Sequence, residues 1–113
     1  MTLFGPQIRV LNRPIRLLAD IMKAPKKAIT RGTEILKSLG ATEVYLFGSA
    51  ASGDFTRDSD LDFAVRGLPA ENFYLAVGTL LDEVRHPIDL DDLSEDTPFS
   101  RRLISRGKLV RVG

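Results

Sequence analysis

Cysteine is absent from the 113 residues of the sequence, and histidine occurs only once, at His86. Without cysteine the chain can form neither a disulfide framework nor a thiolate metal site. This absence is compatible with a reducing cytoplasm, where we expect the protein to reside. His86 stands directly before Pro87, where a helix is expected to end. We therefore interpret it as a surface or helix-terminus residue rather than as a catalytic base.

Long apolar runs are also absent. No stretch approaches the roughly 18 consecutive apolar residues of a membrane-spanning helix, and the N-terminus has no apolar core followed by small residues, as a signal peptide would. We therefore expect no membrane partner. The length of 113 residues predicts one domain with a modest core.

Charge is distributed unevenly, although the net charge is only +1. Residues 1–40 carry eight Lys or Arg against two acids, residues 41–96 carry three against thirteen, and residues 97–113 carry five against none. One interpretation is that solvated basic ends pair with an acidic middle. The other is that the basic flanks hold the phosphates of a substrate whose metal ions sit on the acids.

Hydrophobic periodicity and turn residues predict an α+β (mixed α/β) fold, with a small sheet of three to four strands and helices packed on it. The interval 1–24, interrupted by two prolines, is expected to be a basic arm or short helix, and 25–113 the folded domain. The expected elements are a helix over 25–39, a strand over 42–47, a short helical segment from 49, a strand over 60–65, a helix over 71–84, a strand over 88–90, a helix after Thr97, and a short strand or tail over 108–112.

Two helices carry apolar stripes that predict their buried faces. In the helix over 71–84 the stripe has the helical spacing i, i+4, i+7, i+8, i+11. It consists of Phe73, Val77, Leu80, Leu81 and Val84. In the last helix, capped by Thr97 or Ser94, we expect Phe99, Leu103 and Ile104 to face inward.

Two carboxylates stand at the start of the second strand, where apolar residues follow. Asp60 and Asp62 are two residues apart, so in a strand both side chains project to the same face. Adjacent carboxylates repel each other unless a cation lies between them. Mg²⁺ prefers oxygen ligands and is often held by one or two carboxylates together with substrate phosphates. The pair therefore indicates a hard divalent metal.

Two better-known motifs fail on the same residues. Gly48 and Gly53 have the spacing of a Walker loop, but Asp54 follows where lysine is required. The acidic series from Asp58 begins like an EF-hand loop, but Phe63 stands where that loop requires glycine. Neither a Walker nucleotide site nor an EF-hand is therefore predicted.

The complete pattern resembles the nucleotidyltransferase fold of the DNA polymerase beta-like superfamily. It consists of Gly48-Ser49, a ten-residue interval, Asp60-Leu61-Asp62, and a third carboxylate, Asp89, between apolar residues on a later strand. The phrase 58–62, Asp-Ser-Asp-Leu-Asp, and the small size look like the minimal nucleotidyltransferase (MNT) branch. The resemblance covers roughly residues 25–112.

This resemblance and the chemistry of the residues assign roles. Asp60, Asp62 and Asp89 would bind two Mg²⁺ ions and act in catalysis, with Asp89 also able to take the nucleophile's proton; Asp91 is the second choice for the third carboxylate. ATP would be the substrate. Gly48 lets the backbone approach a phosphate, Ser49 offers a hydroxyl and free N–H groups at a helix start, and Arg57 could reach the triphosphate.

The resemblance also implies a partner. Minimal nucleotidyltransferases are commonly encoded with HEPN-type toxins, and as antitoxins they transfer AMP from ATP to a toxin tyrosine (AMPylation). Many relatives read Gly-Ser-x-Ala-Arg-Gly, whereas Ser52 occupies the arginine position here. This departure keeps open an antitoxin that acts by binding alone. A third alternative is transfer to RNA or a small hydroxylated molecule, with the basic residues 1–40 as a nucleic-acid surface.

Overall fold

The computed structural model describes residues 23–106 and 108–113. Its elements confirm the mixed α/β fold, and among the described helices none has the length and apolar character of a bilayer-spanning segment. The predicted arm over 1–24 lies outside the described residues up to position 22. In chain order the elements are α1 (Lys26–Ser38), β1 (Glu43–Phe47), α2 (Ser49–Ser52), β2 (Leu61–Arg66), η3 (Ala70–Asn72), α3 (Phe73–Glu83), β3 (Ile88–Asp92), α4 (Pro98–Ser105) and β4 (Val110–Arg111).

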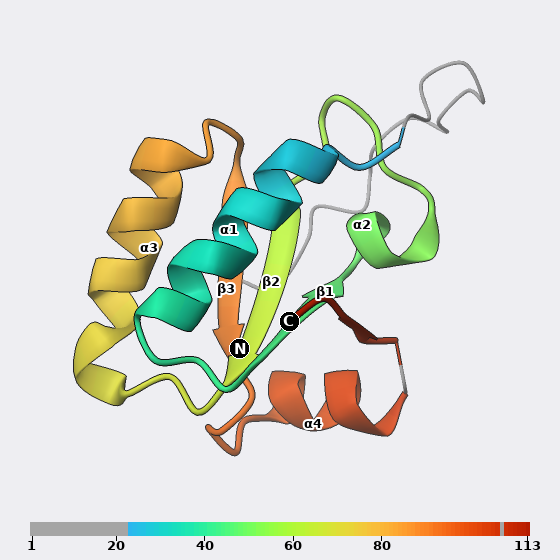
Figure 1. The fold of residues 1–113 in the computed structure, drawn as a ribbon. Helices are drawn as coiled ribbons and strands as arrows, with labels where there is room; N and C mark the ends of the chain where they lie inside the picture. Colours follow the sequence, from blue (N-terminus) through green and yellow to red (C-terminus); the bar gives the residue numbers. More distant parts are fainter. Residues whose placement is uncertain (1–22, 107) are drawn as a thin grey trace.

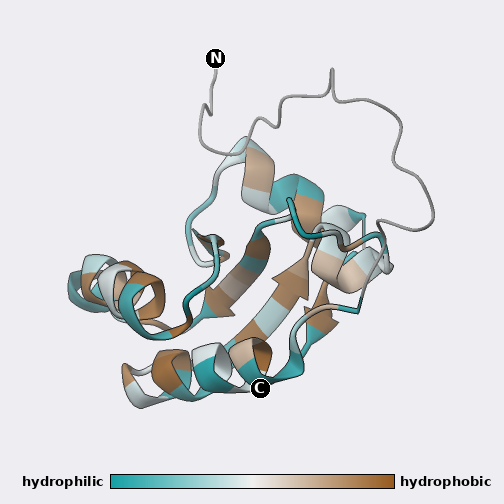
Figure 2. Ribbon diagram, turned by 90° about the horizontal axis from the view of Figure 1, so that it is seen from above, coloured by the Kyte–Doolittle hydropathy of each residue, from teal (hydrophilic) through white to brown (hydrophobic). Residues whose placement is uncertain are grey.

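The four strands form one sheet in the order β3-β2-β1-β4, with β2 at its centre next to β1. β1 is antiparallel to both β2 and β4, while β2 and β3 are parallel and joined through α3. Figure 1 shows the arrangement. Seen from above, the sheet lies between α4 on one side and α1 with α3 on the other (Figure 2). The sheet therefore has a large-core face and an α4 face.

The alternation of β2 separates these two faces. Leu61, Phe63 and Val65 are fully buried in the larger hydrophobic cluster, which contains residues of α1 and α3. Ala64 points the opposite way, into a smaller cluster with side chains of α4. Asp62 shares this second face, because it is two residues from Ala64. The polar site is consequently placed on the side that α4 covers.

Local sequence features mark two helix ends, and the predicted cap at Thr97 is confirmed. Gly40, at φ +115°, follows α1, and the next N–H, of Ala41, donates to the carbonyl of Leu36 at 3.0 Å. At the start of α4, the Thr97 Oγ1 accepts from the backbone N–H of Ser100 at 3.0 Å. The Thr97 N–H in turn donates to Ser100 Oγ at 3.0 Å, which completes a capping box.

Some boundaries and burial expectations were wrong. β2 begins one residue later than expected, so Asp60 precedes the strand. β3 extends to Asp92, and the helix expected over 71–84 divides into η3 and α3. Leu81 is 56% exposed and Ile104 is 45% exposed, although both were expected to face inward. Ala76 instead joins Leu80 as a fully buried contact of α3.

Candidate functional site

The strand register places three side chains in a row across the α4 face. Asp62 of β2 is paired with Phe47 of β1 on one side and with Asp89 of β3 on the other. Paired residues on neighbouring strands project to the same face. Asp62 and Asp89, which we call the carboxylate pair, therefore lie side by side even though 26 residues of chain separate them.

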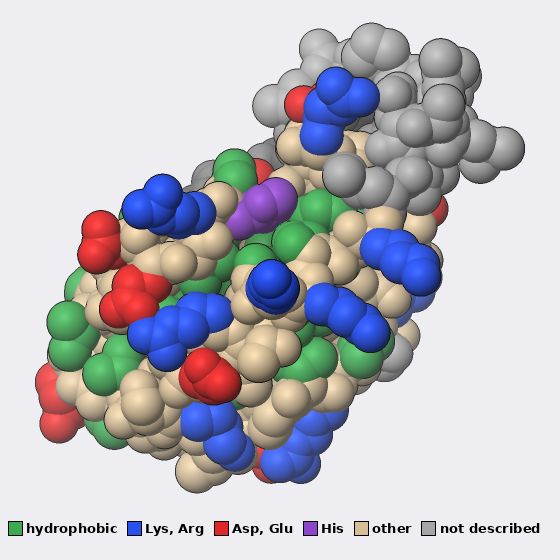
Figure 3. Space-filling view, turned by 45° about the horizontal axis from the view of Figure 1, so that its top comes forward, with side chains coloured by type: hydrophobic (Ala, Val, Ile, Leu, Met, Phe, Trp, Pro, Cys, Tyr) green, Lys and Arg blue, Asp and Glu red, His purple; other side chains and the backbone are tan. Residues whose placement is uncertain are grey.

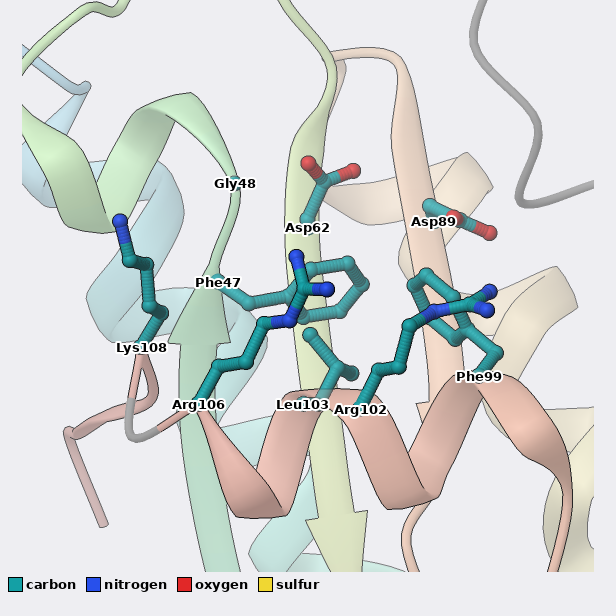
Figure 4. Close-up of a pocket in the computed structure, with 9 residues that line it drawn as sticks. All are labelled: Phe47, Gly48, Asp62, Asp89, Phe99, Arg102, Leu103, Arg106 and Lys108. Atoms are coloured by element: carbon teal, nitrogen blue, oxygen red, sulfur yellow. The ribbon is translucent and has the colours of Figure 1, made fainter.

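A cavity of about 290 Å³ lies between this row and α4. Phe99 of α4 packs edge-to-face on Phe47, with the ring centroids 5.7 Å apart, so an aromatic contact fixes α4 beneath the carboxylate pair. Figure 4 shows the lining side chains, which come from three strands, α4 and the segment after it. They are Phe47, Gly48, Asp62, Asp89, Phe99, Arg102, Leu103, Arg106 and Lys108.

Gly48 brings bare backbone against Asp62 of the carboxylate pair. It has φ +65° and ψ −146°, a conformation that side-chain-bearing residues rarely adopt. A Cβ added there would lie 2.2 Å from Asp62 Oδ2. Gly48 is also the N-cap of α2, without a side-chain cap, and Ser49 is the first residue of that helix. The sequence motif thus produces a close backbone approach at Gly48.

Three other predicted site residues lie outside the lining of this cavity. Asp60 is half-buried just before β2, Ser49 is the first residue of the four-residue α2, and Arg57 is exposed in the turn between α2 and β2. A four-residue helix has little dipole to attract an anion. The roles predicted for Asp60, Ser49 and Arg57 therefore stay predictions.

The side chains that line the cavity supply some, but not all, of the oxygen ligands that a divalent cation needs. Asp62 and Asp89 present hard carboxylate oxygens side by side, and the cavity that they line has room for phosphate oxygens to complete the coordination. However, within residues 23–106 and 108–113 no three His, Cys, Asp or Glu side chains converge as a metal site. The carboxylate pair therefore suits one ion shared with a substrate, and the three-carboxylate set stays a prediction.

Asp91, the alternative third carboxylate, has a different environment. It faces the same side as Asp89, but it is only 9% exposed and does not line the cavity. Its Oδ2 is buried without a hydrogen-bond partner among the described residues. Burial, reinforced by the nearby carboxylates of Asp89, Asp92 and Glu95, raises the pKa of Asp91 from 3.8 to about 6. Asp91 is therefore a buried carboxylic acid close to the cavity, and its environment disfavours the ionised form.

Asp91→Asn should stabilise the protein at neutral pH. Because the folded pKa is raised, the folded state holds the proton more tightly, and stability falls as pH rises from about 4 through about 6. Asparagine removes this penalty, so the free energy of unfolding should rise by about 1 to 3 kcal/mol at pH 7.5 and change little at pH 4. Thermal melts at both pH values measure the difference, with Asp82→Asn on exposed α3 as the control. Equal shifts at both pH values would contradict the assignment.

His86 agrees only in part with its interpretation as a surface or helix-terminus residue. It follows α3 and reaches the molecular surface (purple in Figure 3), but it is half-buried, and its Nε2 is buried without a hydrogen-bond partner among the described residues. Its ring stacks on Phe55 with centroids 5.5 Å apart, and it does not line the cavity. A catalytic base at His86 is therefore not supported by the geometry.

One interpretation of the sequence placed basic flanks at the phosphates of a substrate, but it did not name the basic residues of the cavity. Arg102, Arg106 and Lys108, which we call the cationic row, line it from α4 and the segment that follows. A signal for them existed, since residues 97–113 carry five Lys or Arg and no acid. What the sequence did not indicate is that this segment packs beneath the carboxylate pair.

Comparison with known proteins identifies a matching family model and solved structures with a similar fold. The family model described as polymerase beta, nucleotidyltransferase matches residues 32–111. No curated protein matches the chain. The chain resembles a toxin–antitoxin crystallised with AMP-PNP, at TM-score 0.60 and 21% identity over 78% of this chain and 72% of that one.

Two further solved structures have the same fold. A MntA-HpeT toxin–antitoxin mutant, in which two aspartates two residues apart are replaced by glutamate, gives a TM-score of 0.59 and 19% identity over 73% of this chain and 69% of that one. A protein assigned as a minimal nucleotidyltransferase gives 0.58 and 22% identity, over 78% of this chain and 93% of that one. At these identities the likeness establishes the fold.

Proposed function

The chain belongs to the polymerase beta nucleotidyltransferase family, and from this membership we propose that it is a Mg²⁺-dependent enzyme transferring AMP from ATP to a protein hydroxyl. The observation that carries the proposal is the carboxylate pair, held side by side by strand register at the edge of a cavity, with Asp62 against the bare backbone of Gly48. This arrangement offers oxygen ligands and space for a phosphate at one place.

In the proposed reaction, the acceptor hydroxyl oxygen forms a bond to the α-phosphorus of ATP. The bond from that phosphorus to the α–β bridging oxygen breaks, and pyrophosphate leaves with the electron pair. The Asp89 carboxylate takes the hydroxyl proton. Mg²⁺ held by the carboxylate pair would supply Lewis acidity and neutralise charge on the phosphates. We propose two ions, the second requiring Asp60 as a further ligand.

The proposed acceptor is a tyrosine of a HEPN-type toxin, so that the protein acts as an antitoxin. Support comes from the toxin–antitoxin structures that share the fold and from the Asp-Ser-Asp-Leu-Asp phrase over residues 58–62. The cavity beside Asp62 is partly open to solvent, so an acceptor side chain from another molecule can approach it.

A second candidate is an antitoxin that neutralises its toxin by binding alone. The observation that favours it is the cationic row, which lines the same cavity as the carboxylate pair. Three cations beside two carboxylates can balance their charge without a metal. In that case the fold would keep the site as a structural ion cluster, and nucleotide would not bind.

Incubation with α-labelled ATP, Mg²⁺ and the cognate toxin separates the two candidates. We expect label on the toxin, lost when EDTA removes the metal, and a higher melting temperature with ATP and Mg²⁺, because a ligand of the folded state stabilises it by about 2.7 kcal/mol at one hundred times its Kd. A stable complex with the toxin, without label and without a thermal shift, would instead establish the binding-only antitoxin.

A further inference from the structure

Two rows of residues face each other across the cavity. Figure 4 shows Lys108 beside Gly48, and Arg106 and Arg102 reaching up from α4 toward Asp62 and Asp89. The cationic row therefore runs alongside the carboxylate pair, which projects from the α4 face of the sheet. A ligand lying between the rows would meet carboxylates on one side and guanidinium and ammonium groups on the other.

The packing of α4 holds its part of the cationic row in place. Arg102 and Arg106 are four residues apart, which puts them on one side of the helix. Phe99 and Leu103, also four apart, pack in the smaller hydrophobic cluster against Phe47. Because the apolar side of α4 is anchored and its start is capped by Thr97, the arginines project from a fixed base.

Arg106 and Lys108 differ from the neighbouring Arg101 in their partners. Arg101 is bound by Asp96 through two hydrogen bonds, one of them 2.7 Å long. The ion pairs found between described residues include neither Arg106 nor Lys108. Their charges are thus available to a ligand, and both lie within the last turn of α4 or just beyond it.

Lys108 also connects the site to a second cavity. This cavity, of about 580 Å³, lies on the α2 side of Gly48. Gly48 and Lys108 line both cavities, and Ser52 and Asp54 line only the second. A chain of phosphates that begins at the carboxylate pair can therefore pass Gly48 and Lys108 toward α2 without leaving the lined surface.

We propose that Arg106 and Lys108 bind the β- and γ-phosphates of the nucleoside triphosphate, with the α-phosphate at the carboxylate pair. This inference rests on the proposed function and assigns its phosphate-binding residues to the C-terminal segment. Guanidinium and ammonium groups form charge-assisted hydrogen bonds with phosphate oxygens. The number of phosphates, rather than the base, should then determine how strongly these two residues contribute to binding.

Titration calorimetry of ATP and AMP, each with Mg²⁺, tests this assignment. Arg106→Ala and Lys108→Ala should each weaken ATP binding about tenfold, while AMP binding changes less than about twofold. Arg101→Ala, on the same helix but paired with Asp96, serves as the matched control and should change neither. Adding Ser52→Arg to Lys108→Ala returns a cation to the second cavity, so we expect it to restore part of the ATP affinity.

The outcomes separate this inference from the function on which it rests. If the wild-type protein binds ATP and both variants bind it equally well, only the phosphate assignment is overturned. If the wild-type protein binds no nucleotide, the assignment and the proposed function fall together. If both variants lose stability to heat without nucleotide, as Arg101→Ala does not, the cations are structural counterions of the carboxylate pair and the assignment is again overturned.

Discussion

Asp62→Asn should reduce nucleotidyl transfer by at least about a thousandfold, because the amide keeps the shape of the side chain but loses the charge that would hold the metal. Asp62 is only 2% exposed, touches Gly48 and stands in register with Asp89, so water cannot easily replace its carboxylate. Initial rates of label transfer to the toxin measure the loss. Thermal melting shows whether the variant keeps its fold, so that a loss of transfer can be assigned to the lost charge.

Asp58→Asn is the matched control for this substitution. Asp58 belongs to the same acidic phrase but is exposed in the turn before β2, so its variant should retain transfer within about twofold of the wild type. Asp89→Asn should match the loss at Asp62, and Asp60→Asn shows whether a further carboxylate takes part. Wild-type turnover in both Asp62→Asn and Asp89→Asn would remove the carboxylate pair from the mechanism.

The order of elements could be predicted because local signals mark their ends. Gly40 adopts a positive φ after α1, Thr97 caps α4, and the β2 sequence alternates about a polar Asp62. These signals depend only on residues close in sequence. The register that sets Asp62 beside Asp89 could also be predicted, because two buried strands separated by one helix commonly pair in parallel.

Burial on the helices was harder to predict, because it depends on which neighbours a face receives. Leu81 and Ile104 fit their apolar stripes but are exposed. Ala76 is fully buried although alanine carries little hydrophobic signal. Hydrophobic periodicity predicted approximately which face of each helix is buried, but packing determines which residues at the margin of that face are exposed.

The residues that line the cavity also divide into those that the sequence motif predicts and those whose position depends on packing. The carboxylates and Gly48 come from a compact motif whose spacing is visible in the sequence. Arg106 and Lys108 come from a segment that reaches the site only because α4 crosses the sheet and packs Phe99 on Phe47. Arg57, which is close to the motif in sequence, lies outside the cavity lining. Proximity along the chain was therefore a poor guide to which cations lie near the acids.

Gly48→Ala should impair both folding and transfer. The residue has φ +65° and ψ −146°, a region that is strained by about 1 to 3 kcal/mol for a residue with a side chain. In addition, the new methyl group would lie 2.2 Å from Asp62 Oδ2, so the carboxylate or the backbone must move. We expect a loss of about 2 to 4 kcal/mol in the free energy of unfolding. Transfer should fall about a hundredfold, because a misplaced ligand loses its alignment.

Gly53→Ala separates backbone strain from the clash. Gly53 also has a positive φ, +87°, at the other end of α2, but nothing lies within 4 Å of a Cβ added there. Its variant should lose only about 1 to 2 kcal/mol and should keep transfer near the wild-type rate. Denaturant unfolding and rates of label transfer compare the two. If both alanine variants lost the same stability and neither lost activity, the contact between Gly48 and Asp62 would have no part in forming the site.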